Sequence, residues 1–336
     1  MSAVMPLLDD QTSAACWQGR AGVAALRLCL PSVRVAELAS RAAILEAAAS
    51  PKPGLVCVGS NGAHHDMDYP LFARSAKALR PYFARAHALG QATRALAPHL
   101  VFARLRPLGV WAEQCMLRAT AGVNTHKGLI FSMGLFCAAV GRLNGQQVSA
   151  GRICQEAASF AGGLVQKDFA PLFAARHALR ASLAHADSPR SARGALEARL
   201  QRTLTAGEVL YLLYGIAGIR GEAEGGFLHV GLGLRALEAH GTERSLNTAM
   251  AHCLLELMQS MDDTNILWRG GVAGLRHAAQ SARAALAAGG LATEAGRASL
   301  RRMSADFARR GLSPGGCADI LAVSVFLHLL RCHGIS

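Results

Sequence analysis

Aromatic residues are scarce in this sequence of 336 residues: they make up 5% of the chain, whereas hydrophobic residues as a whole make up 51%. Strands favour β-branched and aromatic side chains, and the Ala and Leu that are abundant here favour helices. The composition therefore predicts an all-α fold. No break in composition divides the chain, so we predict a single large helical domain over residues 1–336, with polar loops between the helices.

Paired cysteines and long apolar runs are lacking too. The nine cysteines form no CxxC pair and are odd in number. No basic and apolar signal segment opens the chain, because Asp9 and Asp10 interrupt the N-terminus. The longest uncharged stretch, between Lys127 and Arg142, is shorter than the ~20 apolar residues of a membrane span. We therefore predict a reduced, cytoplasmic protein without a membrane span, in which that stretch is a buried helix.

Acidic residues are also few, since 22 Asp and Glu stand against 35 Lys and Arg, a formal net charge of +13. Such an excess suits either a nucleic-acid backbone or a polyphosphate ligand. The sequence has no recognisable nucleic-acid-binding motif, few aromatic side chains for base stacking, and dispersed basic residues. We predict no nucleic-acid partner.

A polar stretch rich in glycine and hydrogen-bond donors, residues 121–128, precedes the uncharged run. It contains Asn124, Thr125, His126 and Lys127. The first turn of a helix offers free backbone N–H groups and a positive dipole end, and glycine lets an anion approach the backbone. The stretch therefore predicts a helix start that binds a polyphosphate, although it is neither the GxxxxGK(S/T) loop nor the GxGxxG fingerprint.

Three further polar clusters interrupt the apolar background: residues 51–68, 218–227 and 261–271. They are rich in groups that bind phosphate, metal or sugar hydroxyls. Their candidate residues are Lys52, Asn61, His64, His65, Asp66 and Asp68 in the first, Arg220, Glu222 and Glu224 in the second, and Asp262, Asp263, Asn265 and Arg269 in the third.

Each candidate also has a simpler structural interpretation. Lys52 is then an exposed loop lysine, and Asp66 caps the next helix. Arg220 pairs with acidic neighbours at the surface, and Glu113 faces solvent. An apolar stripe over residues 246–261 predicts a helix that ends at Asp262 and Asp263, where negative charge is unfavourable unless a cation lies nearby.

In this order, the four clusters make the chain resemble the triphosphoribosyl-dephospho-coenzyme A synthases, which make the prosthetic-group precursor of the malonate decarboxylase and citrate lyase acyl carrier proteins. The resemblance runs from about Ala47 to Leu330, includes the segment 313–319, and is weakest over 171–204, a variable segment. Segments 75–81 and 105–109 look more like the malonate decarboxylase branch than the citrate lyase branch.

The resemblance implies transfer of the 5-triphosphoribosyl group of ATP to the 2′-hydroxyl of 3′-dephospho-CoA, with release of adenine. It implies Mg²⁺ as cofactor and a holo-acyl-carrier-protein transferase as recipient of the product; the oligomeric state stays open. Residue chemistry then suggests a role for each candidate. The residues suggested for phosphate and substrate contacts are Lys52, Asn61, Asn124, Thr125, Lys127, Arg220, Asn265 and Arg269. The suggested metal ligands are Asp66, Asp68, Asp262 and Asp263. The catalytic carboxylate would be Glu113, Glu222 or Glu224, and His64 or His126 would protonate adenine.

The chain departs from the family pattern at several positions. Cys57 stands where the family usually has an aspartate, and Trp268 replaces the more usual histidine. Gly226 and Leu228 replace the commoner serine and proline around Phe227. Two alternatives therefore remain: a Mg²⁺-dependent phosphohydrolase or kinase, and a non-catalytic nucleotide-binding protein.

Overall fold

A computed structural model describes residues 26–179, 188–241 and 245–333 of the chain. Most of these residues are helical, and the only strands among them are β1 (Leu26–Arg27) and β2 (Gln147–Val148), which pair antiparallel. The all-α prediction is confirmed. Our prediction for the N-terminus, and part of the variable segment 171–204, fall outside the described residues.

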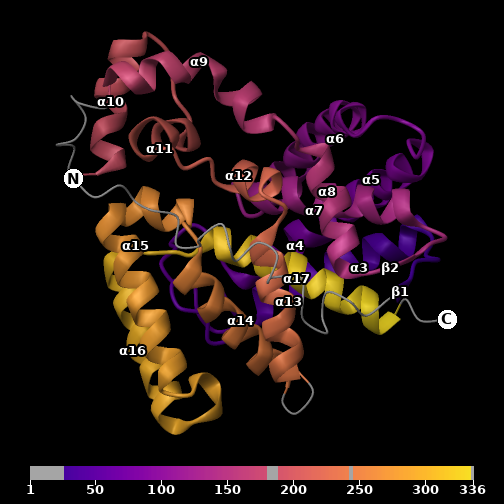
Figure 1. Cartoon of the computed structure of the whole chain (residues 1–336). Helices are drawn as coiled ribbons and strands as arrows, with labels where there is room; N and C mark the ends of the chain where they lie inside the picture. Colours follow the sequence, from indigo (N-terminus) through magenta and orange to yellow (C-terminus); the bar gives the residue numbers. More distant parts are fainter. Residues whose placement is uncertain (1–25, 180–187, 242–244, 334–336) are drawn as a thin grey trace.

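The helices form three consecutive groups along the chain (Figure 1). The first comprises α3 (Ser32–Ala48), α4 (Tyr69–Ala78), α5 (Arg80–Ala92), α6 (Pro98–Ala119), α7 (Lys127–Leu143) and α8 (Ala150–Phe160). The second comprises α9 (Leu164–Leu179), α10 (Pro189–Leu200) and α11 (Ala206–Tyr214). The third comprises α12 (Ile219–Glu224), α13 (Leu228–Gly241), α14 (Leu246–Ser260), α15 (Thr264–Ala287), the 3₁₀ turn η1 (Gly290–Ala292), α16 (Glu294–Arg310) and α17 (Gly315–His333).

Helix α7 is the uncharged run expected from the sequence, and most of its side chains are buried. It packs tightly against α5 because glycine lies at the contact on both helices. A Cβ atom at Gly90 would lie 2.0 Å from the carbonyl oxygen of Ala138, and one at Gly141 would lie 2.1 Å from that of His87. Any larger side chain would push the two backbones apart, so these glycines fix the position of α7 in the core.

Helix α17 runs through the main core, where it packs against α3, α13, α7 and α14. By length and composition alone it is apolar enough to cross a membrane, a property that buried core helices share. Its central residues, from Ile320 to Leu327, are buried inside the protein. The sequence analysis discussed only the uncharged run after Lys127 as a candidate span and did not consider this helix.

Helices α9, α10 and α11 carry a small hydrophobic core of their own, at the upper left of Figure 1. Phe169 and Tyr211 stack there with ring centroids 4.2 Å apart. Trp268, from α15, packs against both this cluster and the main core. Thr205 and Glu208 form the capping box that the sequence predicts at the start of α11. We call α9–α11 the side lobe.

The connection between α14 and α15 corrects one expectation. Helix α14 ends at Ser260, before the acidic pair, and Asp263 is the N-cap of α15. One carboxylate oxygen of Asp263 accepts from the backbone N–H of Asn265 and Ile266, at 2.8 and 3.1 Å, and the other accepts from the N–H of Cys317 at 2.8 Å. The prediction that Asp263 lies at a helix C-terminus is therefore wrong. Asp263 lies at the N-terminus of α15, where a negative charge is favourable.

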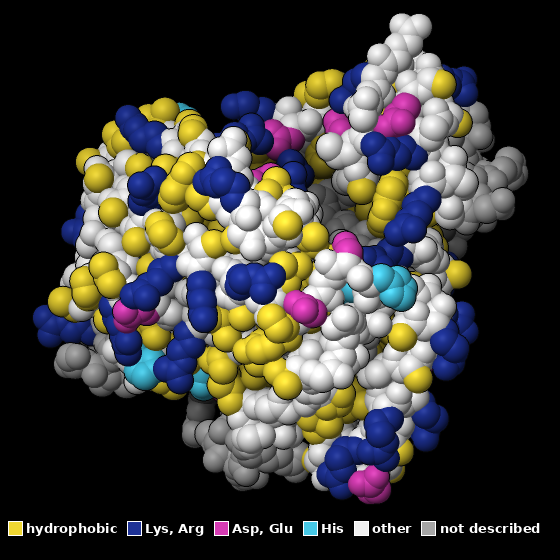
Figure 2. All heavy atoms as spheres, turned by 180° about the vertical axis from the view of Figure 1, so that it is seen from behind, with side chains coloured by type: hydrophobic (Ala, Val, Ile, Leu, Met, Phe, Trp, Pro, Cys, Tyr) yellow, Lys and Arg dark blue, Asp and Glu magenta, His cyan; other side chains and the backbone are white. Residues whose placement is uncertain are grey.

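Lys and Arg side chains are spread over the face shown in Figure 2 and alternate there with apolar and acidic ones. Several belong to ion pairs on one helix, such as Arg297 with Glu294 and Arg310 with Asp306 on α16. On this face the positive charge is distributed, as the sequence suggested. The absence of a nucleic-acid partner remains a prediction.

Candidate functional site

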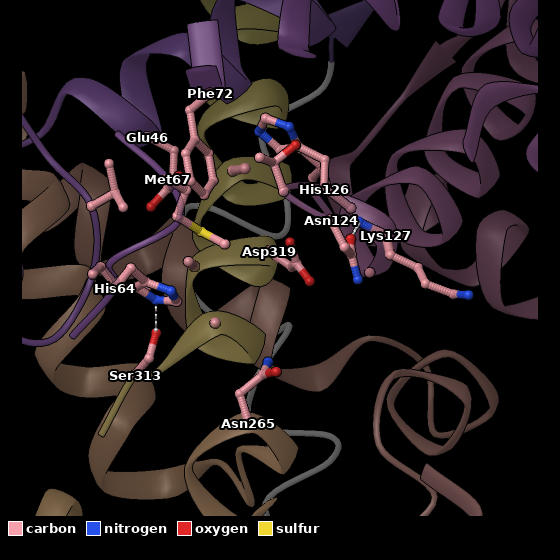
Figure 3. Close-up of a pocket in the computed structure, with 18 of the residues that line it drawn as sticks. Glu46, His64, Met67, Phe72, Asn124, His126, Lys127, Asn265, Ser313 and Asp319 are labelled. Atoms are coloured by element: carbon pink, nitrogen blue, oxygen red, sulfur yellow. Dashed lines mark hydrogen bonds between the residues drawn. The ribbon is translucent and has the colours of Figure 1, made fainter. Parts of the chain in front are cut away.

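Two adjoining cavities collect most of the polar clusters. The first, which we call the polar cavity, has a volume of about 270 Å³ and is lined by residues of α3, α7, α15, α17 and the loops between them (Figure 3). The second, the large cavity, has a volume of about 700 Å³ and lies between the side lobe and the main core. The residues that line both cavities are Asn124, Lys127, Gly128, Asn265 and Asp319. We call them the shared wall.

Asp319, near the start of α17, is the acidic residue of the shared wall. Figure 3 shows it between His64 on one side and Asn124 and Lys127 on the other. Burial, together with the negative charges of Glu46 and Asp263, raises the pKa of Asp319 well above its ordinary value. This shift favours the protonated carboxyl group, which is the form that can donate a proton. The sequence analysis quoted its segment but gave Asp319 no role.

The start of α7 lies directly against Asp319. A Cβ atom at Gly128 would lie 2.0 Å from the Asp319 carboxylate, so only glycine fits there. The backbone of Leu129 hydrogen-bonds Asp319, and the N–H of Lys127 donates to the Asn124 side chain at 3.2 Å. The predicted helix start exists, but acceptor groups of the protein itself already face it.

Lys52 is buried in the wall of the polar cavity, with 4% of its surface exposed. Its Nζ lies 2.5 Å from Oε1 of Glu46 and donates to the Glu46 carbonyl oxygen at 2.6 Å. The interpretation of Lys52 as an exposed loop lysine is wrong. Glu46, its partner from α3, carried no signal in the sequence that separated it from other helix carboxylates.

His126 also lines the polar cavity, and its tautomer follows from its partners. Thr125 Oγ1 donates to Ser75 Oγ at 2.7 Å, and we infer that the Ser75 hydroxyl in turn donates to Nδ1 of His126, which also lies 2.7 Å away. The proton of the neutral ring is then on Nε2, which is buried and makes no hydrogen bond. Burial, aided by the charge of Lys52, lowers the pKa of His126 to about 3. His126 is therefore a neutral hydrogen-bond donor at neutral pH.

Arg269 ties the 61–66 loop to the α16–α17 connection at the edge of the polar cavity. Its Nη1 donates to the carbonyl oxygens of Ala63 and Gly311 at 3.4 and 3.2 Å, and its Nη2 lies 3.4 Å from Nδ1 of His64. His64 Nε2 lies 2.9 Å from Oγ of Ser313. Burial, followed by the charge of Arg269, lowers the pKa of His64. His64 is thus neutral as well.

The large cavity contains a carboxylate–histidine pair. Glu222 accepts from the backbone N–H of His229 at 2.9 Å and from its Nδ1 at 2.7 Å. Burial alone would lower the pKa of His229, but the Glu222 carboxylate raises it above the ordinary value. Nε2 of His229 and Oδ1 of nearby Asp262 are buried and make no hydrogen bond of good geometry, although the Ser260 backbone and the Asp262 charge also help to raise the pKa of His229. This pair is typical of a side chain that exchanges a proton with a ligand. The sequence analysis found Glu222 but missed His229.

Two predicted residues lie in a separate cavity of about 150 Å³, beside α6. Glu113 is there, with its Oε2 3.1 Å from Nζ of Lys127, and so is Arg220, whose Nε lies 2.8 Å from Asp168. Asp168 also binds Arg106. The surface ion-pair interpretation therefore describes Arg220 better than a phosphate site does.

Other candidates cap helices or face solvent. Glu224 accepts from the backbone N–H of Gly163 and Val165, both at 2.9 Å, at the start of α9. Asp68 is the N-cap of α4 and, with Asn61, lines a shallow cavity away from the shared wall. Asp66 is exposed, so the residue that caps α4 is Asp68 and not Asp66.

Among the described residues, no group of three or more His, Cys, Asp or Glu side chains is arranged to hold a metal ion. Of the four predicted ligands, Asp263 uses both carboxylate oxygens as backbone acceptors, and only Asp262 lines the large cavity. Mg²⁺ is commonly held by one or two carboxylates together with substrate phosphates. The buried, unpartnered Oδ1 of Asp262 fits that arrangement and not a metal cage made by the protein alone.

Comparisons with known proteins identify the family of the chain. A family model described as ATP:dephospho-CoA triphosphoribosyl transferase matches residues 32–335. A 2-(5''-triphosphoribosyl)-3'-dephosphocoenzyme-A synthase of Klebsiella pneumoniae is 38% identical over 305 residues, covering 89% of this chain and 91% of the relative. One of Escherichia fergusonii is 37% identical over 297 residues, covering 87% and 89%. No solved structure matches the chain.

Proposed function

The chain belongs to the ATP:dephospho-CoA triphosphoribosyl transferase family and is a transferase, and we propose that it moves the 5-triphosphoribosyl group of ATP to the 2′-hydroxyl of 3′-dephospho-CoA. Adenine is released. The observation that carries this proposal is the shared wall, because two cavities that adjoin at Asp319 suit a reaction in which two bulky substrates meet. Their volumes fall within or just below the range of about 300–1,000 Å³ typical of ligand sites.

We place ATP in the polar cavity and the acceptor in the large one. The polar cavity offers Arg269, Ser313 and the Nε2–H group of His126 to phosphate or sugar oxygens, and Lys127 lies at its border with the large cavity. The large cavity has many apolar side chains, which suit the pantetheine arm of the acceptor. The reacting C1′ atom would then lie near Asp319.

The proton chemistry of the reaction needs one donor and one acceptor. As the bond between C1′ and adenine breaks, its electron pair leaves with the base, which takes a proton from the protonated Asp319. The 2′-hydroxyl oxygen forms the new bond to C1′, and its proton passes to Nε2 of His229, which Glu222 orients. We assign the adenine-protonating role to Asp319 instead of His64 or His126, because both of these rings have lowered pKa values and are neutral.

We propose that Mg²⁺ enters with the phosphates of ATP where the two cavities adjoin, and that Asp262 supplies a protein oxygen to it from the large cavity, in place of Asp66, Asp68 and Asp263. When bound, the ion would neutralise phosphate charge during transfer. In this proposal the metal site is complete only when the ATP phosphates are bound.

We further propose that the product serves the malonate decarboxylase acyl carrier protein through a holo-acyl-carrier-protein transferase in the cytoplasm. The support is the likeness of segments 75–81 and 105–109 to that branch. Segment 75–81 spans the junction of α4 and α5, and segment 105–109 lies in α6. Both lie outside the shared wall, so the chemistry proposed here does not depend on the branch.

The purified protein incubated with ATP, Mg²⁺ and 3′-dephospho-CoA tests the activity. We expect stoichiometric release of adenine, measured by chromatography. We also expect a coenzyme product heavier by one triphosphoribosyl unit, measured by mass spectrometry. ADP or AMP in place of adenine would support the phosphohydrolase or kinase alternative. Unchanged ATP with a folded, nucleotide-binding protein would support the binding-only alternative and refute the transfer.

A further inference from the structure

Arg176, on α9 of the side lobe, lines the large cavity from the side opposite the main core. It lies within the variable segment 171–204, and the sequence analysis gave it no role. We propose that Arg176 binds the diphosphate group of 3′-dephospho-CoA and that the side lobe thereby recognises the acceptor. This inference rests on the proposed function for the identity of the ligand.

The guanidinium group of Arg176 is held in place by its neighbours. Its Cζ lies 5.6 Å from the ring centroid of Tyr211, which stacks on Phe169. The backbone of Gly215 lies so close that a Cβ atom there would be 2.3 Å from Nη2 of Arg176. Gly215 has a φ of +77°, at the C-cap of α11. An aromatic face and a glycine backbone thus orient a planar group that binds phosphate oxygens in pairs.

Arg176 differs from the two lysines of the site in its charge balance. Lys52 pairs with Glu46, and Lys127 pairs with Glu113. Within the described parts of the chain, no carboxylate lies at ion-pair distance from Arg176, and its Nε is buried without a hydrogen bond. A buried donor on an unneutralised cation is costly unless a ligand satisfies it. We therefore expect an anionic group of a ligand to bind Arg176 in the large cavity.

The rest of the cavity indicates which anion that is. Leu210, Tyr214, Ile216 and Trp268 supply apolar and aromatic surface around it. In 3′-dephospho-CoA the diphosphate joins an adenosine to a pantetheine arm, so both of its neighbours favour such surface. The triphosphate of ATP is placed at the polar cavity, on the other side of the shared wall. A diphosphate at Arg176 flanked by apolar groups fits the acceptor better than the donor.

Binding measured by calorimetry tests the inference without depending on turnover. The variants are Arg176→Ala and Arg176→Lys, with Lys167→Ala as a matched control, since it removes one positive charge from an exposed position of the same helix. The ligands are 3′-dephospho-CoA and ATP, each titrated alone, and thermal unfolding checks that every variant is folded.

We expect Arg176→Ala to weaken 3′-dephospho-CoA binding by about 10- to 100-fold, the range for losing hydrogen bonds to a charged group, while ATP binding and Lys167→Ala stay near wild type. Arg176→Lys keeps the charge but loses the planar fork, so we expect an intermediate loss. If Arg176→Ala proves unstable, the lysine variant carries the test alone.

Two results would overturn the inference: unchanged 3′-dephospho-CoA affinity in folded Arg176 variants, or a larger loss for ATP than for the acceptor. The proposed function fails separately. If the wild-type protein binds 3′-dephospho-CoA in an Arg176-dependent way but releases no adenine, the binding site stands and the transfer does not. If an Arg176 variant releases adenine and binds 3′-dephospho-CoA as tightly as the wild type, the transfer reaction stands and the Arg176 binding site does not.

Discussion

Acidification should destabilise the protein through His126, and the size of the effect follows from the structure. The ring is 3% exposed, accepts a hydrogen bond from Ser75 at Nδ1 and has a pKa lowered to about 3. In the unfolded chain its pKa returns to about 6.5. Because the folded value is the lower one, the stability that His126 contributes is present above pH ~6.5 and is lost as the pH falls toward ~3.

At about pH 5 the unfolded chain carries a proton on almost every His126 ring, whereas the folded protein carries almost none. The ratio of the two binding polynomials is then about 30, which corresponds to a loss of about 2 kcal/mol relative to about pH 7.5. The figure barely depends on the folded pKa as long as that value stays below about 4. It is a sizeable part of the ~5–15 kcal/mol stability of a typical domain.

Urea denaturation of the wild type and His126→Gln at about pH 7.5 and about pH 5 measures this loss. We expect the free energy of unfolding of the variant to fall by about 2 kcal/mol less than that of the wild type over this interval. His99→Gln, at an exposed position at the start of α6, is the matched control and should behave as the wild type. Equal losses for wild type and His126→Gln would refute a neutral, buried His126 and would return this ring to the list of proton donors for adenine.

Three other predictions concern the site. Asp319→Asn should lower kcat for adenine release by about 100- to 10,000-fold without lowering the melting temperature, because Asn resembles the protonated acid; unchanged kcat would remove Asp319 from the chemistry. Glu222→Gln and His229→Gln should each lower kcat, and the double variant should be no slower than the slower single one, since the two act as a unit; additive losses in a double-mutant cycle would contradict this. Lys52→Ala should cost about 3–5 kcal/mol in urea denaturation by leaving Glu46 buried and unpaired, and a loss under about 1 kcal/mol would show that the pair is solvated.

Local patterns in the sequence were sufficient for the fold class and for several helix ends. The Thr205–Glu208 capping box and the uncharged run after Lys127 both act over a few residues, so they can be found without tertiary information. Such signals also indicated the clusters around Asn124 and Asn265, two residues that line both cavities. They were wrong at Asp263, since a carboxylate after an apolar stripe also serves as the N-cap of the next helix.

The residues that the sequence analysis missed or gave no role are isolated polar side chains in apolar helices. Glu46 and His229 pair with residues only six and seven positions away, Lys52 and Glu222, but no periodic pattern links a helix residue to a partner beyond the end of its helix. Asp319 reaches the site because the folded chain places α17 beside the start of α7. Conversely, Glu224 and Arg220 belong to a glycine-rich cluster that looked like a ligand loop, but their partners are a helix start and Asp168. Composition alone does not distinguish a polar group that serves a ligand from one that serves the backbone.

The position of the shared wall follows from the packing of the core beneath it. Gly128 and Asp319 lie near the starts of α7 and α17, and most of the following residues of both helices are buried in the main core. The glycine contacts between α5 and α7 leave no room for α7 to shift, and Gly128 leaves none between α7 and the Asp319 carboxylate. The acidic group is thus held on rigid elements, as proton transfer requires. Arg176 instead belongs to the side lobe, which has a separate small core. Arg176 lies within segment 171–204, so we expect variation of that segment to change acceptor recognition and to leave the chemistry on the core helices unchanged.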